Sequence, residues 1–433
     1  MLKSVRNNLF KHNIFFDNGK QASWQDIRDF YSLDSKQNLK LAPKLTKKHI
    51  ELTAFTKMKV KLASQVFSHS VAAGLETHAA FLGSTCKDTA EFVKKFDNLF
   101  DAVNSSQRKC QKPLKCAVTE QSDHMSFFQT TLEWIGTLSV IDDAGKDITN
   151  NIKCIKGWQI SISAIMQLWT DLRNDHGFDF LLTRRLNQDS VENLFSEVRQ
   201  RGGNNDHPTP NNFRHLFKHV CCSKLMTGSI GRNCETEPSK MLDILNHMST
   251  TGKSRTSANF ATAINNQSPV HSLHLNSDLA MPTFPDDHTE ENALYYVCGY
   301  LARKIKLWHD CTNCSKLFSC CSYGSKGYYT ELKAYSDNSL FTVTDAFYIY
   351  IRQLEAAFAS MFDKVKCKDR ILVQTVEALV TINPPTTCSS FPLIKFLSLF
   401  ARMRIYYKIK AHNESLQSSK KPKQDKKLKK LKH

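Results

Sequence analysis

The sequence predicts a predominantly α protein. Apolar residues recur at helical spacing through most of the chain, and few segments show the strict alternation that is typical of strands. The chain has 433 residues, of which 41% are hydrophobic, so it is long enough for two or three domains with separate cores. We find no internal repeat.

The first expected domain covers residues 1–165. Ser23 stands where an N-cap would precede a helix, and Trp24, Ile27, Phe30 and Tyr31 follow at helical spacing. Residues 53–80 look helical throughout, and further helices are expected at 86–106 and 124–140. The predicted core residues of the 53–80 helix are Phe55, Met58, Leu62, Val66 and Val71.

A second region is expected at 166–248, with a loop at 174–180 and a helix at 211–228. Ser, Thr, Asn, His and Pro dominate residues 249–290, which predicts a mobile linker. A helical C-terminal region is expected at 291–412 and a disordered Lys-rich tail at 413–433. Within that region, the expected helices are 291–307, 342–382 and 390–412.

Charge points to a polyanionic partner. The chain carries a net charge of +18, and residues 420–432 hold eight Lys and one Asp. Such a tail suits nuclear import or non-specific DNA contact, and we expect a nuclear protein; a merely solvating end is the alternative. No apolar run is long enough for a membrane helix, and the N-terminus lacks a secretory core. The 14 Cys are therefore expected as thiols, some of them metal ligands.

Two carboxylates, Asp189 and Glu192, stand three residues apart at the start of an amphipathic helix that Gly202-Gly203 would end. One interpretation is a capping box, with Asp189 as N-cap and a buried stripe below it. The other is that Glu192 ligates Mg²⁺ in a phosphoryl-transfer site. The stripe would consist of Val191, Leu194, Phe195 and Val198. The candidate contacts to a DNA backbone are Arg184, Arg185, Arg199 and Arg201.

This segment, Asn-Gln-Asp-Ser-Val-Glu-Asn-Leu-Phe through Arg-Gln-Arg-Gly-Gly-Asn-Asn and Pro-Thr-Pro, resembles the P-element-like transposases, which include the THAP-domain transposases. The resemblance implies that Glu192 is the last acidic residue of an RNase H-like Asp-Asp-Glu triad. It also implies Mg²⁺ as cofactor and transposon-end DNA as partner, with a homo-oligomer or an intact transposase as a protein partner.

The N-terminal phrases Trp-Gln-Asp-Ile-Arg-Asp-Phe-Tyr, Leu-Ala-Pro-Lys-Leu-Thr, Lys-Met-Lys-Val-Lys-Leu-Ala and Val-Phe-Ser-His-Ser-Val-Ala-Ala-Gly resemble the helical insertion with which this family binds GTP. The alternatives from the residues alone are a solvated Lys face and a helix-surface Ser hydroxyl. Gly252-Lys253-Ser254 is not a P-loop, because His247 replaces its first Gly. The nucleotide contacts that the resemblance implies are Lys44, Lys59, Val60, Ser68, Asp101 (or Asp97) and Asp189.

The opening Leu-Lys-Ser-Val-Arg-Asn-Asn-Leu resembles the end of a family motif whose earlier part carries the second catalytic Asp. The first Asp and the THAP zinc finger would lie further upstream. We therefore expect a truncated transposase that binds GTP and DNA, with catalysis incomplete. The alternative is a non-enzymatic, host-adopted nuclear regulator that binds nucleotide or DNA.

Cysteines supply one metal-like cluster. Cys311-x-x-Cys314, with Cys320-Cys321 and His309 nearby, suits a zinc site, although the adjacent second pair is awkward; ordinary thiols are the alternative. Cys110 and Cys116 lie in a Lys-rich loop without partners at zinc spacing.

Overall fold

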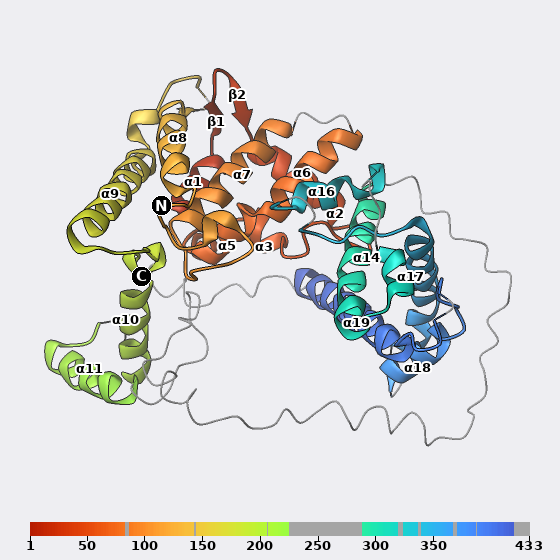
Figure 1. Ribbon diagram of the computed structural model, residues 1–433. Coiled ribbons are helices and arrows are strands. Elements are labelled where there is room, and N and C mark those ends of the chain that lie inside the picture. Colours follow the sequence, from red (N-terminus) through yellow and green to blue (C-terminus); the bar gives the residue numbers. More distant parts are fainter. Residues whose placement is uncertain are drawn as a thin grey trace. The chain divides into compact units, whose positions relative to one another are not determined.

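The computed structural model describes two compact units, which lie within residues 1–269 and 270–433 (Figure 1). The expected linker lies outside the described residues except for its last three, which begin a helix, and residues 420–433 of the expected tail also lie outside them. The described residues are 1–82, 86–142, 144–205, 207–224, 288–318, 324–336, 339–366, 370–386 and 388–419.

The first unit contains a small sheet among helices, and the second is helical over its described residues. The helices and strands of the first unit are α1 (Leu2–Leu9), β1 (Asn13–Phe16), β2 (Lys20–Ala22), α2 (Trp24–Asp34), α3 (Lys47–Ile50), α4 (Ala54–Lys57), α5 (Val60–Val66), α6 (His69–Leu82), α7 (Lys87–Ala102), α8 (His124–Gly136), β3 (Ser139–Ile141), α9 (Lys153–His176), α10 (Asp189–Arg201) and α11 (Pro210–Lys224). Those of the second are α14 (His288–Trp308), α15 (Thr312–Ser315), α16 (Tyr328–Lys333), α17 (Asp345–Val365), α18 (Ile371–Leu379) and α19 (Leu393–Ser419). The predominantly α fold class is thus confirmed.

The antiparallel sheet has the order β2-β1-β3. Ile14 lies opposite both Ala22 and Val140, and all three side chains are buried. Asn18 and Gly19 have φ of 61° and 112° in the β1–β2 turn, the left-handed backbone that an Asn-Gly pair adopts readily. This sheet was not predicted from the sequence, although Asn-Gly is a recognised hairpin signal.

The core of the first unit lies around α7, which packs along α6 (Figure 1). Phe92 and Phe96 sit one helical turn apart on α7, and their rings meet each other at 4.9 Å between centroids. Phe67 and Trp134 pack against the same pair from the α5 and α8 sides. Buried aromatic contacts of this kind add roughly 0.5–1.5 kcal/mol each beyond area burial.

Residues 53–80 form three helices, so the expectation of one continuous helix was wrong. Lys59 is extended, with φ −86° and ψ 113°, and separates α4 from α5. Two predicted core residues face solvent as a result, since Phe55 is 81% and Met58 66% exposed. Val66 and Val71 are buried as predicted.

The predicted helix after Ser23 is confirmed, because the Ser23 side chain accepts a hydrogen bond from the Gln25 amide at the start of α2. The domain boundary that we expected after residue 165 falls inside α9, a single helix of 24 residues. That helix runs to His176 and ends on Gly177 with φ 63°, so the expected loop at 174–180 begins three residues late.

In the second unit, α14, α17, α18 and α19 pack together. The expected helix at 342–382 is divided into α17 and α18, and α19 continues to Ser419, seven residues past the expected end. A Cβ on Gly299 would stand 2.5 Å from the carbonyl oxygen of Phe341, so only glycine permits this close approach. No helix in the described parts of the chain has the length and apolar character needed to cross a membrane.

Candidate nucleotide-binding and catalytic-helix junction

The first turn of α10 holds the two carboxylates of the motif. Helix α10 begins at Asp189 with Gln188 as N-cap, so the expected capping box, with Asp189 as N-cap, was wrong. The amide of Asp189 instead donates to Oδ1 of Asn187 at 3.1 Å. Glu192 lies one turn further and is exposed to solvent.

The expected buried stripe of α10 is largely wrong. Only Val198 is buried, whereas Val191 is 52% and Phe195 45% exposed and Leu194 is half-buried. The rings of Phe195 and Phe213 approach to 6.0 Å, which shows that α10 packs on α11.

Helix α10 ends at Gly202 and Gly203 as the sequence predicted. Gly203 has φ 72°, and a Cβ on Gly202 would stand 2.9 Å from Cδ1 of Leu216. The two glycines therefore turn the chain and let α11 approach α10 closely.

A buried hydroxyl network attaches the segment before α10 to the end of α7. Oγ1 of Thr183 donates to the carbonyl of Ala102 at 2.7 Å and accepts from the amide of Ser105 at 2.9 Å. The amide of Thr183 donates to Oγ of Ser105 at 3.1 Å. Thr183 and Ser105 are both fully buried, so these polar groups depend on one another.

Two further contacts extend this junction. Nδ2 of Asn187 donates to Oδ1 of Asn104 at 3.1 Å, and Asn187 also caps the Asp189 amide. Val118 and Leu181 exchange backbone hydrogen bonds of 2.9 Å in both directions. The start of α10 is thus held by side chains and backbone against the segment that leaves α7.

Asp101, one of the expected nucleotide contacts, lies in the last turn of α7 beside this junction. It is buried and forms an ion pair of 2.7 Å with Lys112, while Asp97 is 3.4 Å from the same ammonium group. Lys115 lies 3.9 Å from the second oxygen of Asp101. An ionised carboxylate can accept more than one hydrogen bond on each oxygen, so the ion pair with Lys112 leaves acceptor positions on Asp101.

Lys59, Val60 and Ser68, three of the other expected nucleotide contacts, lie on or beside α5, and Lys44 lies in the segment before α3. Lys44 and Lys59 are exposed, and Val60 is the first residue of α5. Ser68 immediately precedes α6, and its hydroxyl donates to the carbonyl of Gln65 at 3.0 Å. Helix α5 packs against both α3 and α7, so these contacts and Asp101 stand on elements of one packed body.

Arg6, which is fully buried on α1, was not predicted from the sequence as a residue that shapes this region. Its Nη2 donates to the carbonyl of Lys57 at 2.8 Å and to that of Thr56 at 3.3 Å. Burial lowers the pKa of Arg6 to about 10. Arg6 thereby holds the end of α4 two residues before Lys59. Its place on the apolar stripe of Leu2, Val5 and Leu9 was the available signal.

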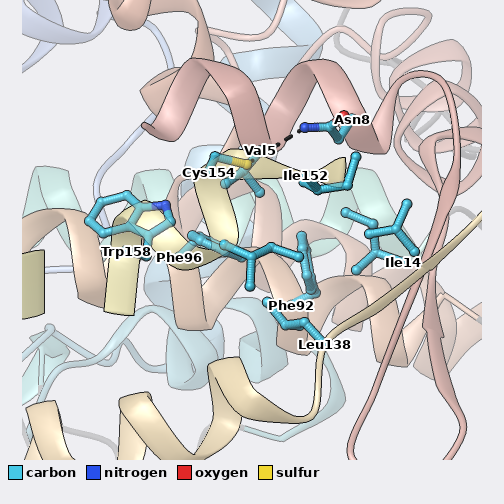
Figure 2. Close-up of a pocket in the computed structure, with 11 residues that line it drawn as sticks. Val5, Asn8, Ile14, Phe92, Phe96, Leu138, Ile152, Cys154 and Trp158 are labelled. Atoms are coloured by element: carbon cyan, nitrogen blue, oxygen red, sulfur yellow. Dashed lines mark hydrogen bonds between the residues drawn. The ribbon is translucent and has the colours of Figure 1, made fainter. Parts of the chain in front are cut away.

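Figure 2 shows a small cavity in the first unit. It is lined by apolar side chains, among them Phe92, Phe96 and Trp158, apart from Asn8 and Cys154. Nδ2 of Asn8 donates to Sγ of Cys154 at 3.6 Å. None of the expected nucleotide contacts lines this cavity, whose apolar walls suit core packing and not a phosphate.

The four candidate DNA contacts flank the carboxylate turn at both ends of α10. Arg185, Arg199 and Arg201 are exposed and Arg184 is half-buried. Arg201 also lies 3.7 Å from Glu197, one turn earlier. Exposed guanidinium groups suit phosphate oxygens, although no described contact of theirs shows a preference for nucleic acid.

The expected zinc ligands Cys311 and Cys314 lie near His309, and the structure adds Cys388 to them. Cys320 and Cys321 lie outside the described residues. Burial raises the pKa of Cys314 to about 11, while hydrogen bonds from Ser390 and then His309 lower that of Cys388 to about 6. In the first unit, the sulfurs of Cys110 and Cys116 stand 3.3 Å apart.

Comparisons with known proteins agree with the two regions of the site. Residues 1–117 match the family described as TNP-like, GTP-binding insertion domain, and residues 185–218 match the TNP-like, RNase H C-terminal domain. The transposable element P transposase of Drosophila melanogaster is 24% identical over 428 residues, which cover 96% of this chain and 52% of the relative. The chain thus spans about half the length of this curated relative.

Among solved structures, the Drosophila P element transposase strand transfer complex matches with 30% identity and a TM-score of 0.44, over 51% of this chain and 49% of the other. The chain thus resembles the P-element-like transposases, and two of its segments match models of a GTP-binding insertion domain and of an RNase H C-terminal domain.

Proposed function

We propose that the protein binds GTP on its first unit and DNA beside α10, and that it does not cleave DNA by itself. The Thr183–Ser105 junction carries this proposal, because it attaches the segment leading to Glu192 to the end of α7 that bears Asp101. A nucleotide held at Asp101 would therefore stabilise the position of the α10 carboxylates. We propose a nuclear location on the basis of the basic tail.

The residue chemistry supports guanine nucleotide in particular. The exposed ammonium groups of Lys44 and Lys59 suit phosphate oxygens, and the Ser68 hydroxyl can donate to one. A carboxylate at Asp101 can accept from the N1–H and the exocyclic amine of guanine together. Adenine offers no such pair of donors, so Asp101 would select between the two purines.

We expect Lys59→Ala to weaken the binding of a fluorescent GTP analogue by about 10- to 100-fold, because a charge-assisted hydrogen bond contributes roughly 1.5–3 kcal/mol. Fluorescence titration measures the dissociation constant. Lys61→Ala, which removes another exposed Lys from α5, is the matched control and should change it little. Equal losses in both variants would favour a solvated Lys face.

The Asp101→Asn variant tests, in the same titration, whether Asp101 recognises the guanine base. An amide can still accept a hydrogen bond but also donates, so the variant should lose affinity for GTP and gain affinity for xanthosine triphosphate, whose 2-position carries an oxygen. Unchanged preference for GTP would contradict the assignment of Asp101. The absence of nucleotide binding in the unaltered chain would overturn the proposed GTP function.

One carboxylate at Glu192 cannot by itself hold two metal ions in line for strand cleavage. We therefore expect the purified 433-residue protein, with linear DNA and Mg²⁺ or Mn²⁺, to produce no nicks on a denaturing gel. Glu192→Ala should give the same result. Nicking that disappears in Glu192→Ala would show that the chain completes its site from other residues.

A further inference from the structure

The cluster of His309, Cys311, Cys314 and Cys388 lies in the second unit, at the end of α14 and the approach to α19. Its four ligand atoms all lie within 4.8 Å of one another. Cys388 lies 77 residues after Cys311 and 79 residues after His309 in the chain. We propose that they hold one structural zinc ion in a Cys₃His site.

The distances approach those of a tetrahedral zinc site. Zn–S bonds of about 2.3 Å and Zn–N bonds of about 2.0–2.1 Å place two sulfurs about 3.8 Å apart and a sulfur and a nitrogen about 3.6 Å apart. Sγ of Cys388 stands 3.9 Å from Sγ of Cys311 and 3.5 Å from Nε2 of His309. Sγ of Cys314, the buried member, lies within 4.8 Å of each of the other three ligand atoms. Zinc binding would therefore have to shorten its distances to them by about 1 Å at most.

Local geometry presents the first pair of ligands together. Cys311 is the N-cap of the four-residue helix α15 and Cys314 lies in its body, so the Cys-x-x-Cys spacing spans one turn. Sγ of Cys311 stands too far from Sγ of Cys388 for a disulfide, which requires about 2.05 Å. Thiols form only weak hydrogen bonds. Three thiols around one imidazole are therefore stabilised more by binding a shared cation than by hydrogen bonds among themselves.

The ligand set also selects the ion and its role. Thiolate and imidazole ligands favour Zn²⁺ over Mg²⁺ or Ca²⁺, which prefer oxygen. Four protein ligands fill the tetrahedron and leave no position for water, so the ion would be structural and not catalytic. It would cross-link the end of α14 to the start of α19 and stabilise the second unit.

The test is the metal content of the full chain, purified without added chelator, by plasma mass spectrometry. We expect about one zinc per chain, and its loss in Cys388→Ser. Cys221→Ser, an exposed cysteine of the first unit, is the matched control and should keep the metal. Cys320→Ser with Cys321→Ser should also keep it, because these residues belong to the competing ligand set.

A second variant separates loss of metal from loss of folding. Cys388→His replaces one zinc ligand by another and should retain the ion, with a changed absorption spectrum after substitution by Co²⁺. The proposal is overturned if the unaltered chain, refolded with zinc, binds none. It is also overturned if Cys388→Ser keeps the ion with an unchanged Co²⁺ spectrum, or if the Cys320 and Cys321 variant loses it.

Discussion

Replacing Arg404 with leucine is expected to destabilise the second unit by about 3–5 kcal/mol. Arg404 on α19 forms an ion pair with Glu355 on α17, and their side chains are 1% and 3% exposed. Removing the guanidinium would leave the Glu355 carboxylate buried without that partner, and the penalty of a buried unpaired charge exceeds that of most lost contacts. Urea unfolding, with hydrogen exchange of α17 and α19 to localise the effect, measures the change.

The control for this prediction is Arg402→Leu, which removes an exposed Arg from the same helix and should cost no more than about 0.5 kcal/mol. Replacing Glu355 and Arg404 together by leucine should recover much of the loss, since neither charge then remains buried. Equal losses in the Arg402 and Arg404 variants would contradict a role for the pair.

Replacing Thr183 with valine is expected to lower the free energy of unfolding of the first unit by about 2–4 kcal/mol, the second large effect. Valine keeps the shape of threonine but removes the hydroxyl that serves both the carbonyl of Ala102 and the amide of Ser105. Each buried group that is left without a partner costs roughly 1–3 kcal/mol. Amide hydrogen exchange should show faster opening of residues 183–189 and of α10, and unfolding measures the total.

Thr130→Val is the matched control, because Thr130 is an exposed helical threonine on α8 whose hydroxyl bonds only to its own helix turn. It should leave stability and exchange nearly unchanged. If Thr183→Val behaves like this control, the junction does not hold the approach to α10 and the coupling between nucleotide and Glu192 loses its structural basis.

Local signals predicted the parts of the fold that short stretches of chain control. Ser23 caps α2 as expected, and Gly202 and Gly203 end α10, because capping and left-handed turns involve only neighbouring residues. The prediction of one helix over 53–80 was wrong because Lys59 has an extended backbone, although apolar residues keep helical spacing on both sides of it. Periodicity reports which side chains could share a face but not whether the backbone between them stays helical.

For the candidate site, the sequence alone determined which residues were proposed and in what order: the Asp189–Glu192 turn, the basic residues around it and the N-terminal phrases that resemble a GTP-binding insertion. Only the tertiary structure decided which of them meet. The structure brings Thr183 to Ser105, which is 78 residues away in the chain. It likewise brings Lys112 to Asp101, 11 residues away, and Cys388 to Cys311, 77 residues away. Such contacts depend on how whole helices pack, because hydrogen bonds and ion pairs act over a few ångströms and carry no signature in local spacing.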